Sequence, residues 1–196
     1  IMDCIPFNVR YRYSEFTDGK VFYKNGAFSV TKLNYNFLTG EMDYLQAGDT
    51  LSIANVTDIK LITVKKDTFY FDNGFLELIK GGSIRVALKQ YLKLLDKVNK
   101  DSYGSSGSGS ATDSYSDFQT TGKNFKLQVN EDRIFKKTLQ YFISVSQDRF
   151  VSLTRKNVMK LFPEKKDTLR DYLKSAEVNF NSKEDILRLA NYLSTI

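Results

Sequence analysis

Residues 20–40 decide the fold, and their sequence is KVFYKNGAFSVTKLNYNFLTG. The Asn-Gly pair at 25–26 is a strong hairpin signal, because both residue types tolerate the positive φ that a tight type I′ turn requires. After this pair, Leu33, Tyr35 and Phe37 share one face of an extended segment, and polar residues occupy the other face. This period of two is typical of a half-buried strand. The stretch therefore predicts an antiparallel hairpin.

The same pattern continues along the chain. Turn residues recur at 39–40, 48–49, 66–67 and 73–74, and the segments between them have strand-like sequences. This spacing is typical of a β-meander. Residues 83–98 fit both a helix and a strand, but their alternation of apolar and polar side chains is longer than their helical stripe, which favours a strand.

Residues 101–122 are rich in serine and glycine and cannot bury an apolar face, so they predict a flexible loop. Residues 104–110 are typical of an engineered linker as well as of a natural loop. A functional loop is a third interpretation, because long loops often contain sites. Tyr103 and Tyr115 are its candidate binding residues. Strand patterns then resume at 125–129 and 133–146.

Residues 154–196 have helical periodicity. Thr154 and Ser182 are predicted N-caps, and Pro163 suits the first turn of a helix. The helices are short and amphipathic, so we expect them to pack on the strands. The sequence therefore predicts an α+β fold. It consists of a mostly antiparallel β-meander, forming a curved or barrel-like sheet, in residues 1–153 (interrupted at about 101–122), followed by C-terminal helices.

The composition removes most familiar catalytic and metal sites. The 196 residues include no histidine and a single cysteine, Cys4. Ser-His-Asp and Cys-His catalysis, His-assisted zinc sites and four-cysteine clusters therefore cannot form within one chain. The sequence also lacks the glycine-rich nucleotide-binding motifs. We predict no catalytic residue, no metal, no cofactor and no enzymatic activity.

Carboxylate pairs keep one enzymatic alternative open. Glu41 and Asp43 point to the same face of a predicted strand, and Asp72 and Glu77 flank a predicted turn. Retaining glycosidases use two carboxyl groups about 5–5.5 Å apart. A carboxylate-dependent glycan hydrolase is therefore an alternative function.

The candidate binding residues are aromatic: Tyr11, Tyr13, Tyr35, Tyr70 and the two loop tyrosines named above. Tyr11 and Tyr13 share a face, with arginines on the other, and such a mixture suits stacking of bases or sugars as well as packing across a curved sheet. The formal charge of +6 is spread along the chain. We expect no nucleic-acid partner, and a single-stranded nucleic-acid-binding barrel is a second alternative.

Several segments carry a family resemblance. They include 154–163 (TRKNVMKLFP), 169–173 (LRDYL), 19–23 (GKVFY), 40–43 (GEMD) and 75–78 (FLEL). Together they resemble uncharacterised exported proteins of the Bacteroidetes group. The resemblance implies a periplasmic or cell-envelope location and no known activity.

The start of the chain bears on export. It begins Ile1-Met2, so we expect that a signal peptide has been removed, and a lipid-modified Cys4 is an open alternative. No apolar run is long enough for a transmembrane helix. The most favoured function is a non-enzymatic binding or assembly module of the bacterial cell envelope, with an envelope protein or a glycan as partner.

Overall fold

The computed structural model describes residues 5–98, 132–145 and 149–196. Cys4, Tyr103, Tyr115, the predicted loop at 101–122 and the predicted strand at 125–129 lie outside the described residues.

The described chain forms one antiparallel sheet of ten strands followed by helices, which confirms the predicted fold class. The strands are β1 (Thr17–Tyr23), β2 (Phe28–Asn36), β3 (Glu41–Gln46), β4 (Asp49–Ser52), β5 (Ile59–Val64), β6 (Asp67–Phe71), β7 (Phe75–Lys80), β8 (Arg85–Val98), β9 (Asp132–Ser144) and β10 (Val151–Ser152). The helical segments are α1 (Phe7–Arg10), η2 (Val56–Asp58), α3 (Arg155–Leu161), η3 (Pro163–Lys165), α4 (Lys166–Ser175) and α5 (Lys183–Leu193).

The sheet joins two meanders. Its order is β10-β9-β8-β7-β6-β5-β1-β2-β3-β4, so each strand pairs with a neighbour in sequence except at the junction, where β5 pairs with β1. The connection from β4 to β5 therefore crosses back over the first meander, and Ile53 and Val56 of this connection pack against the core there. The sheet stays open, with β4 and β10 as its edges.

The sheet curls strongly, because β2 and β8 meet although four strands separate them in the sheet order. The backbone N–H of Leu92 donates to the Phe37 carbonyl at 2.7 Å, and the Tyr35 hydroxyl donates to the Gln90 carbonyl at 2.8 Å. Tyr35 also stacks on Phe69, with ring centroids 5.8 Å apart. The curl thus encloses one apolar core, and we call the enclosed side of the sheet its inner face.

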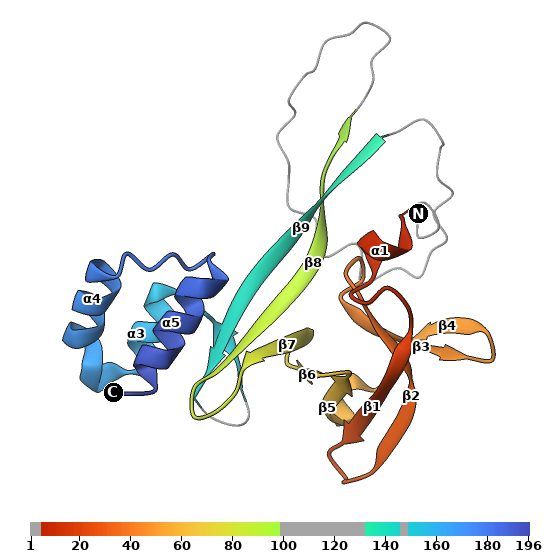
Figure 1. Ribbon diagram of the computed structural model, residues 1–196, viewed down its shortest axis with the longest axis horizontal. Helices are drawn as coiled ribbons and strands as arrows, with labels where there is room; N and C mark the ends of the chain where they lie inside the picture. The colour runs from red at the N-terminus through yellow and green to blue at the C-terminus, as the bar shows by residue number, and fades with distance from the viewer. Residues whose placement is uncertain (1–4, 99–131, 146–148) are drawn as a thin grey trace, which may run out of the picture.

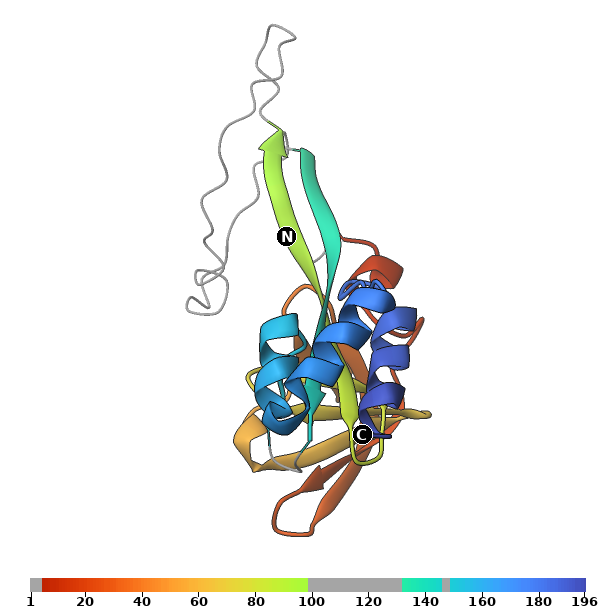
Figure 2. The same ribbon diagram turned by 90° about the vertical axis from the view of Figure 1, so that its left-hand side faces the viewer.

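A second core lies under the helices. Val86 and Ile143 of β8 and β9 are fully buried there against Leu169 and Leu189 of α4 and α5. Figure 1 shows these helices beside the β8–β9 end of the sheet, away from β1–β4, and in Figure 2 they lie toward the viewer. This second core explains why the short amphipathic helices are stable in this position: the sheet buries their apolar stripes.

Local sequence signals account for the boundaries. The Thr154 hydroxyl accepts a bond from the Asn157 N–H, and the Ser182 hydroxyl accepts one from the Asp185 N–H, so both predicted N-caps are confirmed. Residues 83–98 are confirmed as mostly strand. The hairpin at 25–26 is confirmed too, but only Gly26 has a positive φ, so its turn is not the expected type I′.

We expect Gly19 to be essential for the junction between β1 and β5. A Cβ atom there would lie 2.7 Å from the Thr63 carbonyl oxygen and 2.8 Å from Leu33 Cδ1, so backbone would have to shift. Gly19→Ala should lower the free energy of unfolding by about 2 kcal/mol in urea denaturation. The matched control is Gly81→Ala, where the nearest atom lies 4.0 Å away. Equal midpoints for the two variants would contradict this account.

Candidate functional site

Three of the predicted binding residues are part of the core. Tyr11, Tyr13 and Tyr35 are 5%, 7% and 2% exposed, so their rings cannot stack on a ligand. Their hydroxyl groups instead bond to polar groups inside the protein. Tyr70 differs, because it is only half-buried and lies in a surface groove.

The first buried polar group is the carboxylate of Asp43, which is 2% exposed. It accepts hydrogen bonds from the Tyr11 hydroxyl (3.0 Å), the Asn36 side-chain amide (2.9 Å) and the Ser52 hydroxyl (2.7 Å). These donors compensate for the loss of water around the charge. Glu41 is exposed and takes no part in this arrangement, so the predicted pair of Glu41 and Asp43 does not form an open site.

The second polar group is partly buried and surrounds Arg12, whose guanidinium binds both oxygens of Glu77 at 3.1 and 3.2 Å. The guanidinium also lies 3.4 Å from Asp67, which accepts a bond from the Tyr13 hydroxyl at 2.8 Å. Gln90 donates to Glu77 at 2.9 Å. The bidentate geometry fixes the N-terminal segment against β6, β7 and β8.

Asp72, the predicted partner of Glu77, lies elsewhere. Its carboxylate accepts the backbone N–H of Phe150 at 2.7 Å and so anchors the segment that leads into β10. The two carboxylates that the turn was expected to bring together therefore have separate structural partners.

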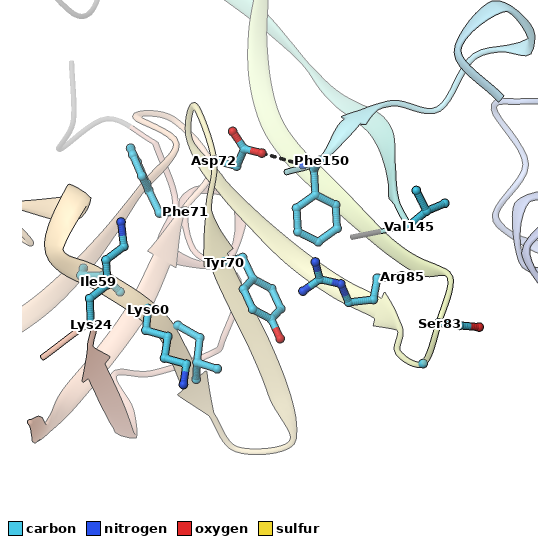
Figure 3. A pocket seen from close by; sticks show the side chains of 12 residues that line it. Lys24, Ile59, Lys60, Tyr70, Phe71, Asp72, Ser83, Arg85, Val145 and Phe150 are labelled. Atoms are coloured by element: carbon cyan, nitrogen blue, oxygen red, sulfur yellow. Dashed lines mark hydrogen bonds between the residues drawn. The ribbon is translucent and has the colours of Figure 1, made fainter. Parts of the chain in front are cut away.

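A groove of about 950 Å³ opens on the side of the sheet opposite the inner face, which we call the outer face. Figure 3 shows its lining residues, which come from β5, β6, β8, the turns after β1, β6 and β7, and the two ends of the β9–β10 connection. They are Lys24, Ile59, Lys60, Leu61, Tyr70, Phe71, Asp72, Gly82, Ser83, Arg85, Val145 and Phe150.

Arg85 is held firmly at one side of this groove. Its guanidinium carbon lies 5.4 Å from the centroid of the Tyr70 ring and 5.1 Å from that of Phe150, and Nη2 donates to the Ser144 hydroxyl at 3.2 Å. The two rings lie 5.8 Å apart. Cation–π contact with both rings fixes the orientation of the guanidinium.

The groove is electropositive. Lys24, Lys60 and Arg85 contribute positive charge, whereas Asp72 contributes the single carboxylate among the described lining residues. A cleft lined mainly by one sign of charge concentrates ligands of the opposite sign. Its volume lies within the range of about 300–1,000 Å³ that is usual for small-molecule sites. The groove is therefore suited to an elongated anionic ligand.

The sequence predicts Tyr70 as a binding residue but does not indicate the three cationic side chains that line the same groove. Lys24, Lys60 and Arg85 lie on three separate segments, and only the pairing of β1 with β5 and the meander from β5 to β8 bring them together. No spacing in the sequence links them, so no local motif could have revealed the group.

Comparisons with known proteins give no information on the groove, so its interpretation rests on its geometry. No protein-family model matches the chain, and neither a curated protein nor a solved structure is significantly similar to it. Within the described ranges, no three side chains of metal-binding type gather as a metal site would require. Of the described helices, none has the length and apolar character to cross a membrane.

The buried tyrosines predict a loss of stability at alkaline pH. Burial first, and then the nearby Asp43, raises the pKa of Tyr11 to about 12, while burial and the bond to Asp67 raise the pKa of Tyr13 further. The folded state therefore retains phenol protons that the unfolded chain loses above about pH 10. The contribution of these phenol groups to the free energy of unfolding is fully present below that pH. Above it the free energy of unfolding falls, by up to about 1.4 kcal/mol per pH unit for each tyrosine.

Urea denaturation at a series of alkaline pH values measures this slope. We expect Tyr11→Phe to be less stable at neutral pH, because Asp43 loses a donor, and to have a shallower alkaline slope than the parent. The control is Tyr44→Phe, whose hydroxyl is exposed beside Gln46. A slope for Tyr11→Phe as steep as that of the control would contradict the assignment.

Proposed function

We propose that this protein is a non-enzymatic binding module of the bacterial cell envelope that holds an acidic glycan in its outer-face groove. The observation that supports this most is that three cationic side chains, Lys24, Lys60 and Arg85, line the same groove as the half-buried ring of Tyr70. The envelope location is supported by the resemblance of the sequence, and fractionation of the native cells tests it.

A glycan fits the mixed lining better than a purely apolar ligand does. Sugars combine apolar ring faces with many hydroxyl groups, and the groove offers apolar side chains such as Leu61 and Phe71 beside the hydroxyl groups of Tyr70 and Ser83. Acidic sugars add carboxylates, which pair with lysine and arginine through charge-assisted hydrogen bonds. The contacts around Arg85 hold that side chain in place, which reduces the entropy lost on binding.

The carboxylate-dependent hydrolase has less support. Glycoside hydrolysis uses two carboxyl groups across the scissile bond. Among the described residues of the groove, Asp72 alone carries a carboxylate, and one of its oxygens accepts the Phe150 N–H. Asp67 and Glu77 do lie close together, but both bind the Arg12 guanidinium.

Charge reversal in the groove tests the proposal. Lys60→Glu should weaken binding of hexagalacturonate by at least about ten-fold at low salt in isothermal titration calorimetry, because a repulsion replaces an attraction. The matched control is Lys66→Glu, which makes the same change in net charge on an exposed turn outside the groove. Neutral maltohexaose should bind neither variant nor the parent.

Three outcomes would contradict the proposal. They are equal binding by the two variants, binding of maltohexaose as tight as that of hexagalacturonate, and release of shortened sugars during incubation, which would favour the hydrolase. Tighter binding of a single-stranded oligonucleotide than of hexagalacturonate would favour the nucleic-acid alternative.

A further inference from the structure

An apolar patch next to the groove lies outside the core, on the protein surface. Phe28 and Val30 of β2 are 60% and 58% exposed, and they share one face because they are two residues apart on a strand. Phe28 pairs across the sheet with Phe22 of β1, and Phe22 pairs with Leu61 of β5. We call these four residues the hairpin patch. It is a continuous apolar surface, a feature that marks interaction sites in soluble proteins.

The patch lies on a projecting part of the molecule. In Figures 1 and 2, the β1–β2 hairpin extends beyond the rest of the sheet, at the end opposite the extended arm of β8 and β9. A flat surface can therefore approach the hairpin without meeting the helices.

Cationic side chains flank the patch. Lys20 pairs across the sheet with Val30, and its ammonium nitrogen lies 5.8 Å from the centre of the Phe28 ring. Lys24 is exposed in the turn of the hairpin. Two acids lie nearby: Asp18 forms an ion pair with Lys32 at 3.3 Å, and Asp58 is exposed beside the turn. The surroundings are therefore positive in sum.

The geometry distinguishes between classes of partner. A peptide added as a strand beside the start of β2, which pairs with β3 only from Leu33 to Asn36, would extend the sheet and leave the outward faces of Phe28 and Val30 uncovered. A lipid leaflet instead accepts projecting apolar side chains, and anionic headgroups attract the lysines beside them.

We infer that the hairpin patch docks on a membrane surface rich in anionic lipid, with Phe28 and Val30 inserted between headgroups and with Lys20 and Lys24 at the headgroup level. This inference is independent of the ligand in the groove. The docked hairpin would hold the groove close to the membrane, since Leu61 belongs to both surfaces.

Co-sedimentation of the full chain with vesicles tests the inference. The parent should bind vesicles of phosphatidylglycerol and phosphatidylcholine in equal parts, and should bind pure phosphatidylcholine vesicles weakly. The double variant Phe28→Ser with Val30→Thr should bind the anionic vesicles at least about ten-fold more weakly, because the inserted apolar area is lost. The matched control, Leu51→Ser, removes another exposed apolar side chain, on β4, and should bind like the parent.

Lys20→Gln separates the charge from the apolar contact. It should weaken binding to anionic vesicles about five-fold and leave binding to phosphatidylcholine unchanged. The double variant should keep the parent's far-ultraviolet circular dichroism spectrum and unfold cooperatively in urea, which shows that it is folded whether or not the groove binds hexagalacturonate.

Two results would overturn the inference. The first is equal binding of anionic vesicles by the parent and the double variant. The second is self-association of the parent that the double variant abolishes, without vesicle binding by either, which would assign the patch to a second copy of the chain.

Discussion

The pairing of β1 with β5 is the interaction on which the rest of the structure depends. It is the one place where strands distant in sequence join the two meanders, and it requires glycine at position 19 because the Thr63 backbone and the Leu33 side chain approach so closely. The pairing allows the sheet to curl until β2 meets β8, which encloses the inner core. It also places the turn after β1 beside β5 and so completes the outer-face groove.

The polar clusters and the groove have different roles. The polar groups around Asp43 and around Arg12 with Glu77 have their hydrogen bonds satisfied within the protein, and they fix how the N-terminal segment sits on the strands. Groups on the outer face around Arg85 are positioned by packing but border open space. A polar cluster that is satisfied internally contributes to specificity of the fold, whereas a cation that lines a groove can contact a ligand.

The sequence predicted the elements better than the site. Alternation and turn residues located the strands, including 83–98, and capping residues located α3 and α5, because these signals are local. The aromatic residues near the start have a pattern suited to stacking, but Tyr11 is buried against Phe7 and Phe16, and Tyr13 is buried in the core that the curl encloses. Alternation shows which residues share a face and not which face is enclosed. The cations of the groove could not be predicted for the same reason, because long-range strand pairing brings them together.

We propose that ligands meet this protein in the outer-face groove, while the polar clusters around Asp43 and Arg12 are structural. Mapping of backbone amide chemical shifts by NMR during titration with hexagalacturonate tests it most directly. The account predicts shifts that cluster at Lys60, Leu61, Tyr70 and Arg85, around the groove. Shifts that cluster instead at Arg12, Asp67 and Glu77 would contradict the account, because they would place the binding site at the cluster that we assign to folding.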